Sequence, residues 1–196
     1  ALYALQRYYA NDTENATIFA LERGTDLAVT NGGTGNFYGI YDPNYLKLSA
    51  SQVGFMWRTM YQIIGKANEI IAAAEDLEDT PSLRATVSEA KCFRAQSYFL
   101  LYRTFDRIWL NIQPTTAENV NDPRDFHAAS EKEVFDLIYE DLEYAITNLD
   151  WVSDEAGRFT QAAARHMKAK AALWLKDWDT TLEQVEEIEK SGHFDL

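Results

Sequence analysis

The chain has 196 residues, of which 46% are hydrophobic and 13% aromatic, enough apolar side chains for a substantial core. Its 31 acidic and 18 basic residues give a formal net charge of −13, which repels phosphate backbones and argues against a nucleic-acid partner. Cys92 is the only cysteine, which excludes an intramolecular disulfide and a metal site made of cysteines. No apolar run approaches the ~18 residues of a membrane span.

The first part of the chain alternates helical and irregular patterns. Leu2, Leu5 and Tyr8 indicate a short helix at the beginning. Residues 24–50 mix glycine, asparagine and tyrosine without a helical period, and loops of this length in a compact domain are usually functional or disordered. From residue 51 to residue 77 apolar side chains recur three and four positions apart, which predicts a helix with a wide buried face.

Cap signals mark the next helices. Thr80 followed by Pro81 is typical of an N-cap and a first helical residue, and predicts a helix that runs to about residue 105 inside the domain. Residues 106–129 form a second irregular segment, which contains two prolines. Ser130 and Glu133 match a capping box and predict a helix that continues to residue 149.

The segment AAARHMKAKAALWLKDWDTTLEQV, residues 162–185, predicts a hairpin of two short helices. Thr160 and Asp177 can cap these helices, and Gly192 marks the end of the second one. The six alanines of the segment let two helix backbones approach closely, as in tetratricopeptide repeats. Because no strand pattern is present, the predicted fold class is all-α: tetratricopeptide-like helical hairpins with long irregular loops.

Five residues on the predicted helices are expected to be structural. Trp57, Trp174 and Trp178 fall on apolar stripes and are expected in the core. Asn68 and Arg94 interrupt apolar helices, and a buried amide or charge without partners costs several kcal/mol. We expect both to hydrogen-bond loop backbone and carboxylates, so that they hold the helices to the long loops; direct ligand contact is the alternative.

Residues suited to catalysis or metal binding do not form a recognisable pattern. Cys92 lies among apolar neighbours on a predicted helix, a setting that raises a thiol pKa and leaves the thiol inert. His127, His166 and His193 are too scattered for a triad or a metal site. We therefore expect no catalytic residue, no metal and no cofactor.

Four blocks of sequence resemble, in order and spacing, successive blocks of the SusD/RagB family. They are MWRTMYQIIGKANEII (56–71), EAKCFRAQSYFLLYRTF (89–105), EKEVFDLIYEDLEYAITNL (131–149) and GRFTQAAARHMKAKAALWLKDWDTTLEQVEEIEKSGHFDL (157–196). DRIWL, at 106–110, departs from the turn that the family usually has there. Because family members are longer, the resemblance implies that residues 1–196 are a single SusD-like helical domain, the amino-terminal part of a longer protein.

The resemblance also implies a location and a role. Such proteins are non-catalytic, lipid-anchored on the outer face of a Gram-negative outer membrane, and typical of the Bacteroidetes. They capture oligosaccharides, or in some members peptides, above a TonB-dependent transporter of the SusC type. The lipidated cysteine would lie upstream of Ala1, because Cys92 is within a predicted helix.

Aromatic and amide side chains of the irregular segments are the candidate ligand contacts. A ring face can pack against the C–H face of a sugar, while amides and carboxylates hydrogen-bond its hydroxyls. The candidates are Asn36, Tyr38, Tyr41, Asn44, Tyr45, Trp109 and Trp151. The alternative is that the tyrosines only pin a long loop onto the helices.

Two other functions stay open from the sequence alone. A tetratricopeptide-type module holds a peptide or a partner helix in its helical groove. A glycosidase ranks behind both binding functions, because no two acidic residues stand out as a separated acid and base.

Overall fold

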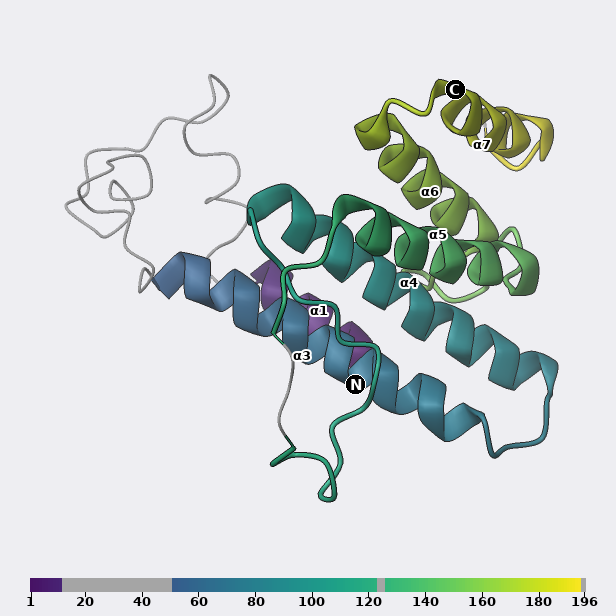
Figure 1. The fold of residues 1–196 in the computed structure, drawn as a ribbon. Helices are drawn as coiled ribbons and strands as arrows, with labels where there is room; N and C mark the ends of the chain where they lie inside the picture. Colours follow the sequence, from purple (N-terminus) through teal and green to yellow (C-terminus); the bar gives the residue numbers. More distant parts are fainter. Residues whose placement is uncertain (12–50, 123–125, 195–196) are drawn as a thin grey trace. The chain divides into compact units, whose positions relative to one another are not determined.

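The computed structural model describes residues 1–11, 51–122 and 126–194 (Figure 1). These residues contain helices and no strand, which confirms the predicted all-α class. The helices are α1 (Leu2–Asn11), α3 (Ser51–Ala74), α4 (Pro81–Thr104), α5 (Glu131–Asn148), α6 (Gln161–Leu175) and α7 (Trp178–Lys190). In the described parts of the chain, no helix has the length and apolar character needed to cross a membrane. The chain divides into two compact units, residues 1–63 and residues 64–196.

The first unit pairs α1 with the beginning of α3. The ring of Tyr9 stacks on the ring of Phe55 with centroids 6.1 Å apart, and Tyr8 meets Phe55 edge-on at 5.6 Å. Leu2, Tyr9 and Phe55 are buried, so they form the core of this small unit. The helix predicted at the beginning of the chain is therefore confirmed.

The second unit consists of the end of α3 and two helical hairpins. α4 and α5 lie side by side in the first hairpin, α6 and α7 form the second, and α5 packs on α6 (Figure 1). The hydroxyl of Thr80 accepts a hydrogen bond of 3.1 Å from the backbone of Leu83, and Pro81 is the first residue of α4, as predicted. The rings of Phe93 and Tyr98 are fully enclosed, so α4 is the central helix of this unit.

The predicted capping box at the beginning of α5 is present. The backbone N–H of Glu133 donates to the Ser130 hydroxyl at 3.3 Å, and the backbone N–H of Ser130 donates to the Glu133 carboxylate at 2.8 Å. Both terminal donors of the helix are thereby satisfied, which fixes the point at which the chain leaves the second irregular segment. The apolar face of α5 that follows is buried against α4 and α6.

The corner between α6 and α7 depends on two residues. Lys176 adopts a left-handed backbone conformation with φ of 60°, and the Asp177 carboxylate caps α7 by accepting from the backbone of Thr180 at 3.1 Å. Ala164 and Ala171 on α6 have no exposed surface. The alanines therefore provide the close helix contacts that the sequence predicts.

The prediction that Trp174 and Trp178 lie in the core is wrong, because 45% and 58% of their surfaces are exposed. Alanines, not tryptophans, occupy the tight contact, and Trp174 lies at the edge of that face. The side of α7 that faces α6 carries Gln184, which accepts a hydrogen bond of 2.9 Å from Arg165. Its apolar stripe, which begins at Trp178, therefore points outward. Trp57 is half-buried.

Candidate functional site

A charged cluster around Asp141 of α5 lies inside the second unit. Arg94 of α4 donates two hydrogen bonds of 2.7 Å to the two carboxylate oxygens of Asp141, whose surface is fully buried. Lys91 donates a third bond of 2.8 Å to the same carboxylate. The remaining Arg94 nitrogen, Nη1, donates to the amide oxygen of Asn68 on α3 at 2.8 Å. This charged cluster therefore joins three helices through bidentate and charge-assisted bonds.

The charged cluster continues into the irregular segment after α4. The amide nitrogen of Asn68 donates to the carbonyl of Asn111 at 2.7 Å. The hydroxyl of Tyr98 donates to the same carbonyl at 3.0 Å and accepts from the Asn111 backbone N–H at 2.7 Å. A backbone bond of 2.9 Å from Ala129 to Ile108 closes the base of the segment. Asn68 and Arg94 thus have the loop-backbone and carboxylate partners that the sequence leads us to expect.

The anchored segment carries Trp109, one of the sequence-predicted ligand contacts. Trp109 is half-buried, and its ring lies 4.9 Å from the ring of Phe126 at an angle of 55°. Phe126 is 70% exposed. The Ile108–Ala129 bond explains this pairing, since it brings the two arms of the segment together. Phe126 is missing from the sequence-based candidates because only the closed base of the segment places it beside Trp109.

Trp151 has a different environment. The Arg165 guanidinium carbon lies 5.4 Å from the centre of the Trp151 ring, and the His193 ring lies 6.2 Å away. Trp151 is half-buried between these neighbours. Its ring therefore ties the segment after α5 to α6 through a cation–π contact with Arg165, and to the residues after α7 through the ring contact with His193. The other candidates, Asn36, Tyr38, Tyr41, Asn44 and Tyr45, lie outside the described residues.

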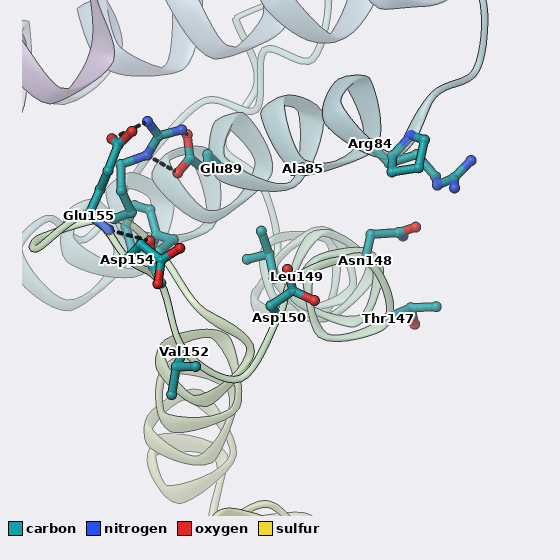
Figure 2. A pocket seen from close by; sticks show the side chains of 14 residues that line it. Arg84, Ala85, Glu89, Thr147, Asn148, Leu149, Asp150, Val152, Asp154 and Glu155 are labelled. Atoms are coloured by element: carbon teal, nitrogen blue, oxygen red, sulfur yellow. Dashed lines mark hydrogen bonds and ion pairs between the residues drawn. The ribbon is translucent and has the colours of Figure 1, made fainter. Parts of the chain in front are cut away.

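A cleft of about 850 Å³ lies where the beginning of α4, the end of α5 and residues 150–159 meet (Figure 2). Asp154 and Glu155 lie on one side of it and Thr147 and Asn148 on the other (Figure 2). Arg158 fixes one wall through two hydrogen bonds of 2.6 and 2.7 Å to the Glu89 carboxylate. Sequence reasoning did not find this cleft, because its walls come from positions far apart in the chain.

The cleft can accept hydrogen bonds but offers no open aromatic face. In the part of the chain that the structure describes, the carboxylates of Asp150 and Asp154 have no hydrogen-bond or ion-pair partner. These carboxylates can accept hydrogen bonds from the hydroxyls of a ligand. Phe159, the aromatic residue of its lining, packs edge-on against Phe93 at 4.9 Å. The cleft therefore lacks the stacking surface that Trp109 and Phe126 provide.

The thiol of Cys92 is not placed to act as a nucleophile. Cys92 has no exposed surface, and burial, together with the negative charges of Asp141 and Glu89, raises the pKa of its thiol far above the ordinary value. The described residues contain no group of three or more histidine, cysteine, aspartate or glutamate side chains that could hold a metal ion. The described arrangement is a helical scaffold whose second irregular segment is anchored by hydrogen bonds and carries the aromatic pair Trp109 and Phe126.

Comparison with known proteins identifies the family to which this helical scaffold belongs. The SusD-like family model described as "Starch-binding associating with outer membrane" matches residues 5–173, and the chain belongs to this family. A SusD-like protein of Bacteroides ovatus is 30% identical over 160 residues, which cover 75% of this chain and 28% of the relative. The chain thus spans less than a third of that relative's length. The resemblance seen in the sequence is confirmed.

Two solved structures share the fold of almost the whole chain. A laminarin-binding SusD-like protein is 26% identical, with a TM-score of 0.82 over 95% of this chain and 41% of its own. Surface glycan-binding protein A of Bacteroides fluxus is 25% identical, with a TM-score of 0.77 over 96% of this chain and 41% of its own. The family is one of non-catalytic, carbohydrate-binding proteins associated with the outer membrane.

Proposed function

We propose that the protein binds oligosaccharides at the cell surface without cleaving them. The observation that carries this proposal is the likeness, over 95% of the chain, to a structure that binds laminarin, at a TM-score of 0.82 and 26% identity. The glycan-binding protein of Bacteroides fluxus supports the same substrate class. Inert Cys92 and the absence of a metal-binding group among the described residues accord with capture rather than catalysis.

The ligand contacts in this proposal are aromatic and amide side chains on loops. Trp109 and Phe126 form one contact surface, on a segment that the charged cluster and Tyr98 hold in place. Anchoring before binding lowers the conformational entropy lost when a ligand is held. The tyrosines and asparagines of residues 36–45 provide a second set, and Trp151 is a weaker candidate because Arg165 already covers part of its ring.

Replacement of Trp109 by alanine is expected to weaken binding of laminari-oligosaccharides about tenfold, because one ring contact with a sugar is lost. Isothermal titration calorimetry on the full-length protein measures this change. Val120→Ala is the matched control, because Val120 is an exposed apolar residue of the same segment, with 53% of its surface accessible. Equal affinities of the Trp109 and Val120 variants would show that Trp109 does not contact the ligand. Release of shorter sugars from the oligosaccharide would favour a glycosidase.

We further propose that the protein is lipid-anchored and delivers its ligand to a SusC-type TonB-dependent transporter. The family's association with the outer membrane supports this partnership. After mild detergent extraction of outer membranes, affinity purification of the tagged protein is expected to recover a TonB-dependent transporter. The two proteins are expected in about equal amounts, because a closed complex has a fixed stoichiometry. Recovery of the protein alone, from membranes that contain the transporter, would contradict the partnership.

A further inference from the structure

α4 and α6 border a groove whose floor is formed by α5. The groove contains a cavity of about 170 Å³, lined by Gln96, Phe99, His166, Lys170 and, at its floor, Ile138 and Leu142. Both floor residues are 1% exposed, so the base of this α4–α6 groove is apolar and closed. The groove is separate from the Trp109–Phe126 surface, since it lies on the helices and not on the irregular segment.

Two aromatic side chains and one cationic side chain extend the α4–α6 groove toward the ends of both helices. The rings of Phe99 and Trp174 lie 6.4 Å apart at right angles. The Arg103 guanidinium carbon lies 5.3 Å from the centre of Phe99 and 5.4 Å from that of Trp174. From Gln96 to Arg103 the groove extends about 10 Å along the helix axis. Arg103 is therefore held above two rings while its N–H donors face solvent.

The basic side chains of this groove make no hydrogen bond or ion pair with the described residues. Among the described residues of the second unit, every lysine and arginine side chain makes a hydrogen bond or an ion pair, except Arg103, Lys170 and Lys176. Two of these three lie in the groove. The side chains of Gln96 and His166 also make no hydrogen bond to the described residues.

The charge of the groove is opposite to that of the whole chain. The chain has a formal net charge of −13, yet no carboxylate of the described residues lines the cavity of the groove, and α6 contains no acidic residue. The carboxylate nearest to Arg103 in the sequence is that of Asp106, which lies past the end of α4, is 98% exposed and is 3.8 Å from Arg107. A local excess of unpaired cations on an acidic molecule attracts an anionic ligand to that place.

We propose that the α4–α6 groove binds an acidic sugar residue of the captured oligosaccharide. This inference rests on the proposed glycan-binding function and specifies a substrate class for it. Arg103 and Lys170 would hold the carboxylate or sulfate group through charge-assisted hydrogen bonds. The exposed part of Trp174 packs against the C–H face of the sugar ring, and the Gln96 amide hydrogen-bonds its hydroxyls. Aromatic and cationic groups side by side suit a charged ring better than a neutral one.

Calorimetry on the full-length protein tests the groove with three probes: trigalacturonate, a sulfated trisaccharide and neutral laminaritriose. The two acidic probes distinguish a carboxylate from a sulfate as the anion. Arg103→Gln/Lys170→Gln is expected to weaken binding of the preferred acidic probe about tenfold or more, because two charged contacts are lost. Lys170→Gln alone is expected to weaken it about threefold. Lys176→Gln, which removes an equally unpaired lysine outside the groove, is expected to leave it unchanged.

The outcomes separate this inference from the proposed function. Binding of laminaritriose with no binding of either acidic probe would overturn the inference and leave glycan capture intact. Equal losses in the Lys170 and Lys176 variants would also overturn it, because diffuse charge would then explain the affinity. A glutamate-rich peptide that displaces the acidic sugar and binds more tightly would assign the groove to a protein partner instead. Failure of all three sugars to bind would count against glycan capture itself.

Discussion

Replacement of Arg94 by alanine is expected to lower the free energy of unfolding by about 3–5 kcal/mol, the cost of removing one partner from a buried ion pair. The Asp141 carboxylate, which has no exposed surface, would keep Lys91 as its only direct cationic partner among the described residues. The amide oxygen of Asn68 would lose its donor at the same time. Chemical denaturation with a fluorescence readout measures the change, because five tryptophans report on unfolding.

A matched arginine variant separates this effect from the general loss of a charge. Arg84→Ala removes the 2.8 Å ion pair with Asp79, whose side chain is 75% exposed. Exposed ion pairs contribute about 0–1 kcal/mol, so this variant is expected to stay close to the parent protein. If the Arg94 variant has an unchanged melting temperature, the charged cluster does not hold the helices together.

Simultaneous replacement of Tyr38, Tyr41 and Tyr45 by alanine is expected to reduce glycan affinity about 100-fold, because several ring contacts worth about 1 kcal/mol each are lost together. The three positions lie outside the described residues, so the prediction depends on their sequence pattern. Asn36 and Asn44 lie in the same segment and provide the hydrogen-bonding groups that a sugar needs. Titration with the oligosaccharide used for Trp109 measures the loss.

The corresponding triple phenylalanine variant is the control for this experiment. It keeps the rings and removes only the hydroxyls, so it is expected to retain most of the affinity if stacking is the main contact. Circular dichroism and the melting temperature show whether each variant is folded. A folded triple alanine variant with unaltered affinity would assign these tyrosines to packing of the loop alone.

Local signals made the helices predictable. Thr80 with Pro81, the Ser130–Glu133 box and Asp177 each act within one helical turn, and the structure shows all of them in their predicted roles. The prediction of a helix to residue 77 was less accurate. α3 ends at Ala74. Apolar Leu77 extends the pattern, but it is 60% exposed and forms no part of the helix.

Long-range geometry could not be predicted in the same way. The pattern of apolar residues placed Trp174 and Trp178 inside, but periodicity does not say which of two possible faces a neighbouring helix covers. Arg94 was expected to bond a carboxylate, yet its partner Asp141 is 47 positions away and nothing local identifies it. For the same reason, the sequence did not identify Phe126 or the residues of the α4–α6 groove as candidate ligand contacts.

The way residues 105–130 are attached separates a part of the molecule that can change in evolution from the helical core that cannot. The Asn111 bonds hold the beginning of this segment to α3 and α4, and the Ile108–Ala129 bond joins its beginning to its end. Substitutions and insertions between these attachment points leave the charged cluster untouched, and lengthening a surface loop costs little closure entropy. Such a chain can acquire a new ligand preference at the tip of the segment without a new core.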